Sequence, residues 1–173
     1  HRPVDLNAVV EAVGSVPFKD RTAGFRNYFF KRELMRWSEF REAPIFGRPQ
    51  YHHHDTTLAN CMIIAGAQGG LDVQALAHGM LEGHWRHDAD LADRATLSDI
   101  STRAGYDSAT LLGAAITPAA LDEYRANTAT AIERSMFGSP TYFVDGDMFY
   151  GQDRLEMVER AITTPFTQDW TGP

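Results

Sequence analysis

The feature that most constrains the fold is a Ser-Pro pair directly before a β-type segment, in the stretch GSPTYFVDGD at residues 138–147. Proline cannot donate a hydrogen bond to a strand ladder, so it is tolerated only at the start or the edge of a strand. TYFV is rich in strand-forming residues, and the Asp-Gly pair after it is typical of a hairpin turn. MFYG then supplies a second strand, and QDRLEMVERAI an amphipathic helix. The chain therefore ends in a strand, hairpin, strand and helix that follow a proline.

The segment before this unit has the helical period of apolar residues. Helices are predicted over residues 5–14, 23–40, 56–70, 71–88, 96–105, 107–116 and 117–138. The stripe of aromatic residues along 25–40 is interpreted as core, and its exposed members could line an aromatic pocket or a dimer face. The opening residues resemble the tail of a strand, so we expect an α/β protein whose helices occupy the middle and whose sheet is made by the two ends.

Several helix boundaries carry capping residues. Thr96 is a candidate cap for the helix that stops at Gly105, and Thr117 is an N-cap followed by Pro118 at the first helical position. Gly138 is placed just past the end of the helix that Thr117 begins. These signals predict where the helices start and stop.

Bulk composition excludes several classes of function. The 173 residues suffice for one domain, or for one domain with a large insertion, and no apolar run is long enough to span a bilayer. A net charge of −7 argues against nucleic acid as a partner. Cys61 is the only cysteine, so no internal disulfide can form, which fits a reducing compartment. We expect a soluble, cytoplasmic protein without a membrane partner.

The conformation of the Ser139–Pro140 peptide bond decides what the loop can bind. A cis bond would turn the chain sharply and leave the backbone of Ser139 unpaired, free to bond an extended peptide as one more strand would. An ordinary trans proline at the end of a loop is the alternative. Base rates favour the trans form; the unit of strand, hairpin, strand and helix resembles the C-terminal half of a thioredoxin-type fold, and this resemblance implies a cis proline facing the active site.

The stretch FGSPTYFVDGDMFYGQDRLEMVERAI resembles the 2-hydroxychromene-2-carboxylate isomerase family and the related kappa-class glutathione transferases, which are DsbA-like members of the thioredoxin superfamily. The resemblance rests on F-G-x-P-T, the hairpin and G-Q-D-R-L, and extends weakly over residues 2–162. It implies an α/β fold: a thioredoxin-like sheet at residues 1–18 and 137–166, with a large all-helical insertion at 19–136. It also implies that the N-terminal strand and helix of the family are absent from this chain.

The resemblance implies a glutathione-dependent isomerase of aromatic compound catabolism, which acts on an aromatic or conjugated carboxylate by reversible thiol addition, and a homodimer. Glutathione would be held by Ser139, Pro140, Gln152, Asp153 and Arg26. Gln152 and Asp153 are expected where the last helix begins, and Asp153 could pair with the γ-glutamyl ammonium. The alternatives are that Asp153 only caps its own helix and that Arg26 is a solvated residue.

The catalytic residue remains unassigned. In the resembled family a serine at the start of the first helix faces the sulfur, and here it is expected upstream of His1. A Cys-x-x-Cys in that place would instead make the protein a DsbA-like thiol-disulfide oxidoreductase. A third possibility is a non-catalytic binding protein of the same fold.

The remaining candidate metal-binding residues are mostly histidines. YHHHD offers His52, His53, His54 and Asp55, and HWRH offers His84 and His87, which are residue types that bind zinc or nickel. Adjacent residues point in different directions, so no metal site is predicted. One of these histidines could instead face a substrate.

Overall fold

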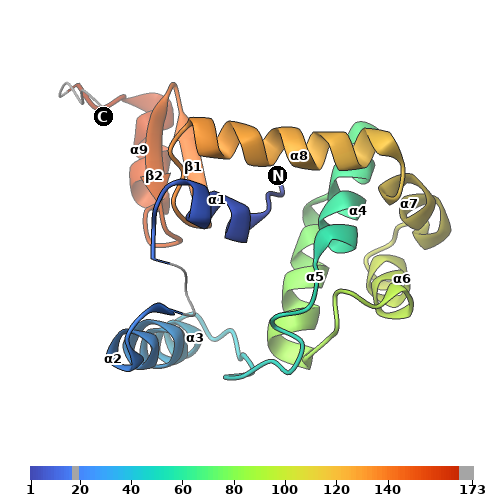
Figure 1. The fold of residues 1–173 in the computed structure, drawn as a ribbon, viewed down its shortest axis with the longest axis horizontal. Coiled ribbons are helices and arrows are strands. Elements are labelled where there is room, and N and C mark those ends of the chain that lie inside the picture. Colours follow the sequence, from blue (N-terminus) through green and yellow to red (C-terminus); the bar gives the residue numbers. More distant parts are fainter. Residues whose placement is uncertain (17–19, 168–173) are drawn as a thin grey trace.

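A computed structural model describes residues 1–16 and 20–167 (Figure 1). The N-terminal part contains α1 (Leu6–Ala12) and one continuous helical segment made of α2 (Ala23–Asn27), the π-helical η2 (Tyr28–Glu33) and α3 (Leu34–Phe40). The middle contains α4 (Thr57–Gln68), α5 (Gln74–His87), α6 (Arg94–Arg103), α7 (Ser108–Ala115) and α8 (Pro118–Glu133). The chain then forms β1 (Thr141–Val144), β2 (Asp147–Tyr150) and α9 (Leu155–Thr163). The predicted helices and the two strands are therefore present.

The two strands form an antiparallel hairpin in which Thr141 lies opposite Tyr150 and Val144 opposite Asp147. Asp145 and Gly146 both have positive φ, 49° and 95°, which suits the tight two-residue turn that the Asp-Gly pair predicts. Helix α9 packs against β1. This hairpin and α9 lie together beside the C-terminal end of α8 (Figure 1).

The main hydrophobic core is formed by α4 to α8. Its fully buried members include Met62, Leu76 and Leu97, and α4 contributes an almost unbroken buried run from Cys61 to Gly66. Helix α4 packs against both α7 and α8, which explains why it is apolar around most of its circumference.

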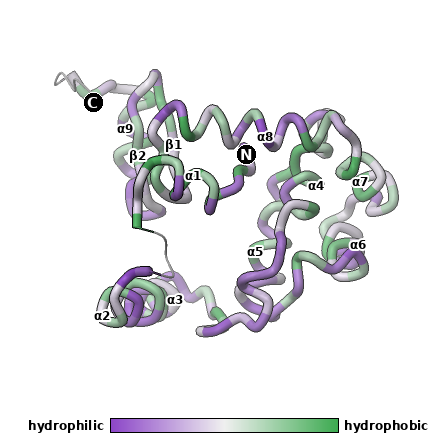
Figure 2. The backbone as a smooth tube through the Cα atoms, viewed as in Figure 1, coloured by the Kyte–Doolittle hydropathy of each residue, from purple (hydrophilic) through white to green (hydrophobic). Residues whose placement is uncertain are grey.

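Helix α8 joins this core to a second, smaller one. Ala120 near its start belongs to the main core, whereas Ala131 near its end packs with Val9 of α1 and with Met136. Hydrophobic and hydrophilic residues alternate along the helix in Figure 2, as expected for an element covered along one face. The domain division at residues 18/19 and 136/137 stays a prediction, and its first boundary lies outside the described residues.

Three predictions about helix ends and strands were wrong. Helix α6 is capped by Asp93, whose carboxylate accepts from Thr96 N at 2.8 Å, so Thr96 lies inside the helix. Helix α8 ends at Glu133, well before Gly138, and Ser135 with φ 56° follows it. The opening residues form no strand, because Asp5 caps α1 instead, accepting from Ala8 N at 3.1 Å.

The aromatic segment at residues 23–40 is helical as predicted, but it is not core. None of its residues is buried, and Phe29 and Phe40 are 48% and 74% exposed. The side chains cover one another instead, with Phe25 and Phe29 ring centroids 4.5 Å apart. This segment projects beyond the main helical body in Figure 1. In residues 1–16 and 20–167, no helix has the length and apolar character needed to cross a membrane.

Candidate functional site

The Ser139–Pro140 peptide bond is cis, which confirms the prediction for this loop. Ser139 is exposed, and its N–H and C=O have no hydrogen-bond partner in the part of the chain that the structure describes. Thr141, the residue after Pro140, closes the turn by donating from Oγ1 to Gly138 O at 2.6 Å. The loop therefore presents one free donor and one free acceptor of the main chain to solvent, in the form that an extended peptide can pair with.

The hairpin brings a second loop against this one. Gly151 N donates to Pro140 O at 3.0 Å, which extends the pairing of Thr141 with Tyr150 by one step. Gln152 and Asp153 follow Gly151 directly and are exposed. Four of the five predicted site residues thus lie in two adjacent loops at one end of the hairpin: Ser139, Pro140, Gln152 and Asp153.

The start of the last helix differs from the prediction. Helix α9 begins at Leu155, because Gln152 and Asp153 form a turn closed by a hydrogen bond from Arg154 N to Gly151 O. Arg154 is the N-cap residue, and no side chain caps the helix, so the alternative role of Asp153 as a helix cap is wrong. The amides of Leu155 and Glu156 make no hydrogen bond in the described chain and face outward from the helix start.

The carboxylate of Asp153 is folded back over Gly151. Its Oδ2 pairs with Arg154 Nη1 at 2.5 Å, while Oδ1 would lie 2.5 Å from a Cβ atom placed on Gly151. One oxygen is therefore held by a local cation, and the other faces the glycine whose amide bonds Pro140. Both side chains of the pair are partly exposed, so a ligand ammonium can reach the carboxylate from solvent.

The glycines of the F-G-x-P-T and G-Q-D-R-L motifs shape this site, although neither was predicted as a site residue. Gly151 has φ +111°, and a Cβ on Gly138 would lie 2.4 Å from the Tyr150 ring. Gly138 is buried beneath that ring, which also packs edge-on against Phe137 with centroids 4.9 Å apart. The sequence indicates this arrangement by one glycine in each loop: Gly138 directly before Ser139, and Gly151 directly after Tyr150.

Replacing Gly151 by alanine is expected to destabilise the protein by about 1–3 kcal/mol, because a residue with Cβ is strained at this φ. The new Cβ would also push the Asp153 carboxylate out of its present position. Urea unfolding followed by circular dichroism measures the loss. Gly113→Ala is the matched control, since that glycine has no positive φ and open space around it; an equal cost at both positions would show that strain at Gly151 is not the cause.

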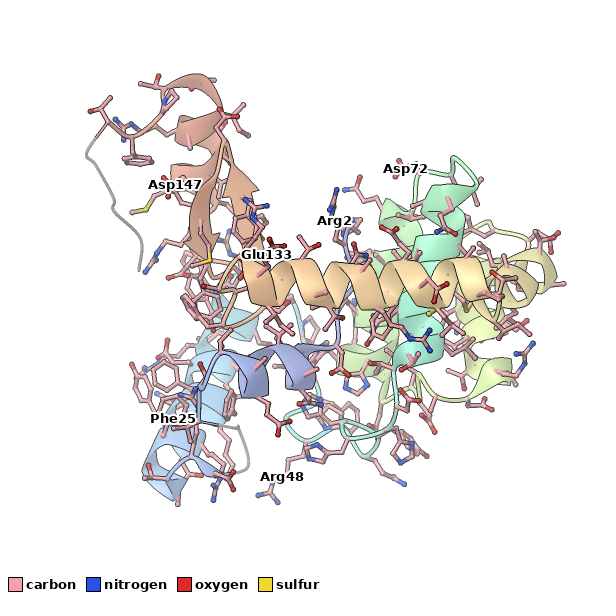
Figure 3. All side chains as sticks on the ribbon, turned by 45° about the horizontal axis from the view of Figure 1, so that its top comes forward. Arg2, Phe25, Arg48, Asp72, Glu133 and Asp147 are labelled. Atoms are coloured by element: carbon pink, nitrogen blue, oxygen red, sulfur yellow. The ribbon has the colours of Figure 1, made fainter. Side chains whose placement is uncertain are left out.

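Arg26, the fifth predicted residue, comes from a different part of the molecule. It lies on α2, where its Nη1 donates to the backbone carbonyl of Arg21. Helix α2 and the hairpin stand apart in both Figure 1 and Figure 3, where Phe25 and Asp147 mark the two regions. The structure therefore does not place Arg26 beside Ser139, and its role in ligand binding stays a prediction.

The histidines form a chain of hydrogen bonds at the end of α5. His84, which is buried, lies 3.3 Å from Ala89 O through Nδ1 and 3.1 Å from His52 Nδ1 through Nε2. A carbonyl can only accept, so His84 donates from Nδ1 and its Nε2 accepts from His52. Burial lowers the pKa of His52, and the neighbouring His84 and His53 lower it further. These contacts fix the loop before α4 to α5.

No group of three or more His, Cys, Asp or Glu side chains in residues 1–16 and 20–167 is arranged to hold a metal ion. His54 pairs with Asp90 at 3.0 Å and takes no part in the His52–His84 contact. Two grooves occur elsewhere, one between α3 and the loop after it and one between α5 and α6. Neither is lined by the two loops of the hairpin.

The cis-proline loop, the hairpin and the final helix on it define a thioredoxin-like protein with a large helical insertion. The sequence model of the DSBA-like thioredoxin domain matches residues 1–163, and the chain belongs to this family. A solved structure of a 2-hydroxychromene-2-carboxylate isomerase matches the fold with a TM-score of 0.73 and 27% identity, covering 92% of this chain and 76% of that one.

Within the family, the chain is related to 2-hydroxychromene-2-carboxylate isomerases. It is 30% identical to the isomerase of Pseudomonas sp. (strain C18) over 160 residues, covering 92% of this chain and 73% of the relative. It is 27% identical to the isomerase of Sphingobium xenophagum over 162 residues, covering 94% and 81%. These relationships confirm the resemblance seen in the sequence and make the chain an enzyme of the isomerase class.

Proposed function

We propose that the protein is a glutathione-dependent isomerase that acts on an aromatic or conjugated carboxylate. The observation that carries the proposal is the free backbone of Ser139 beside the turn of Gln152 and Asp153, held there by the bond from Gly151 N to Pro140 O. A tripeptide with a γ-glutamyl head needs both features: main-chain partners for its cysteinyl part and a carboxylate for its ammonium.

The described residues fit each end of such a ligand. Ser139 N–H and C=O can pair with the cysteinyl residue as an edge strand would. Asp153 can accept from the γ-glutamyl ammonium, and the free amides of Leu155 and Glu156 can donate to its α-carboxylate at the positive end of α9. Bound glutathione would supply a thiolate for reversible addition to the double bond of the substrate. The role of the protein residues is to orient the tripeptide and to favour the charges at its γ-glutamyl end.

A thermal-shift titration tests the proposal. Glutathione should raise the melting temperature progressively, with the logarithm of its concentration once this exceeds the dissociation constant, because a ligand that binds only the native state stabilises it. Cys-Gly, which lacks the γ-glutamyl group, should produce little shift. Absence of any shift with glutathione up to about 10 mM would count against glutathione use and leave the binding-protein and oxidoreductase alternatives.

We also propose that the protein is a cytoplasmic homodimer. The exposed aromatic residues Tyr28, Phe29 and Phe40 support dimerisation, because a monomer rarely leaves large apolar side chains together in solvent, and none of the three lines the groove beside α3. Sedimentation of the 173-residue chain reports its oligomeric state directly. The single cysteine and the use of glutathione support a reducing compartment.

A further inference from the structure

The groove between α3 and the loop that follows it has an apolar wall. It encloses about 320 Å³ and is lined by Phe30 of η2, by Leu34 and Met35, and by Ile45 of the loop. A volume of this order accommodates a small organic molecule with one or two rings. The groove contains none of the residues of the cis-proline loop or of the Gly151–Asp153 turn, so it is a separate feature of the molecule.

Two cations stand on the border of this apolar wall. Lys31 bonds only a neutral group, Asn27 Oδ1, at 2.8 Å, and Arg48 has no hydrogen-bond or ion-pair partner in residues 1–16 and 20–167. Five other arginines of the described residues do pair with a nearby carboxylate, as Arg36 does with Glu33. The positive charge at the groove is thus left uncompensated by the protein.

The sequence around the groove accentuates this charge. Four cations occur between residues 26 and 36, and Glu33 is the only acidic residue there, although the whole chain carries a net charge of −7. Figure 3 shows the Arg48 side chain at the edge of the molecule, open to solvent. The groove between α5 and α6 differs, because both Asp72 and Glu82 line it and no single sign of charge prevails.

We propose that the groove between α3 and residues 45–48 binds a small amphipathic carboxylate, with its ring against Phe30 and Met35 and its carboxylate between Lys31 and Arg48. An aromatic body contributes by burying apolar surface, and the charge-assisted hydrogen bonds orient the carboxylate. A neutral ligand of the same shape gains binding free energy only from the burial of its apolar surface. The selection of an anion is therefore the property that distinguishes this site from a nonspecific apolar groove.

Calorimetric titration of the full 173-residue chain with 2-naphthoate and with 2-naphthamide tests the proposal. Naphthoate should bind saturably at one site, and naphthamide should bind at least about fivefold more weakly, as expected for loss of a partly exposed ion pair. Arg48→Gln and Lys31→Gln should each weaken naphthoate binding about fivefold. Arg32→Gln is the matched control, since Arg32 precedes the same α3 but does not line the groove, and it should leave the affinity unchanged.

A second variant tests the location without removing charge. Gly47 lines the groove, has an ordinary φ and has open space where a Cβ would stand, so Gly47→Leu can fill the groove without backbone strain. It should abolish naphthoate binding while the melting temperature stays unchanged. Equal affinity for the acid and the amide, or naphthoate binding unaffected by Gly47→Leu and Arg48→Gln, would overturn the proposal.

The same titration separates this site from the glutathione site. Saturating glutathione should leave naphthoate binding intact, and so should Asp153→Ala. Failure of glutathione to bind would not affect the naphthoate result, whereas displacement of naphthoate by glutathione would mean that the two ligands share one site and would refute a groove site separate from the glutathione site.

Discussion

Replacing Asp153 by alanine is expected to raise the dissociation constant for glutathione by about tenfold, on the scale of one lost charge-assisted hydrogen bond. The carboxylate lies over Gly151, next to the cis-proline loop, and Arg154 occupies only its Oδ2 in an ion pair. Oδ1 therefore remains for the γ-glutamyl ammonium. Calorimetric titration of the wild type and the variant measures the change directly.

Asp122→Ala supplies the matched control. Asp122 also pairs with an arginine one turn away, Arg125 at 2.9 Å, but it lies on α8 and away from the hairpin. The control removes the same charge and breaks a similar ion pair, so it should leave the affinity unchanged. Asp153→Asn, which keeps the shape and removes the charge, should behave as the alanine variant does. An unaltered dissociation constant in both Asp153 variants would refute the role of this carboxylate.

Truncating Leu97 to alanine is expected to lower the free energy of unfolding by about 3 kcal/mol, because the side chain is fully buried and the surrounding helices cannot collapse fully into the space it leaves. Leu97 lies on α6, which packs against both α5 and α7 in the main core. Urea unfolding monitored by circular dichroism gives the change in stability from the shift in midpoint at constant slope.

The control for this prediction is Leu81→Ala on α5, where the leucine is 59% exposed. Its truncation should change the stability by no more than about 0.5 kcal/mol. Similar losses at both positions would mean that leucine truncation acts through the unfolded chain or through helix propensity and not through the core. A larger loss confined to Leu97 would confirm that α6 is an integral part of the core.

Local chemistry determined most of what could be predicted. The helical period, the Thr117-Pro118 start of α8 and the Asp-Gly hairpin signal depend on neighbouring residues alone, and each is present in the structure. The proximity of Ser139 to Asp153 also follows from local rules, since a two-residue turn fixes the strand register and so aligns the loops before and after the hairpin. This is why four of the five site residues could be placed together.

The remaining differences depend on features that the local pattern does not contain. The predicted start of α9 at Gln152 was wrong because Gly151 adopts a positive φ and the turn after it uses two more residues before the helix. An aromatic stripe such as that at 23–40 has the same period in a buried helix as in an exposed one. Periodicity could therefore identify the apolar face of the helix, but not whether another element covers that face. The position of Arg26 depends on how α2 is held relative to the hairpin, which no short motif specifies.

The buried thiol of Cys61 can report on the separation of helices α4 and α8. Its thiol lies on α4 against α8, with Sγ 4.0 Å from Ala120 O, and burial raises its pKa, so a thiol-reactive dye cannot modify it while the two helices stay together. Because the chain has no other cysteine to react with the dye, the labelling rate measures how often α4 and α8 separate. Helix α8 also contacts the hairpin through its C-cap residue Arg134, whose guanidinium lies 3.5 Å from the centroid of the Phe143 ring, so the same labelling rate reports how long the ligand loops keep this support.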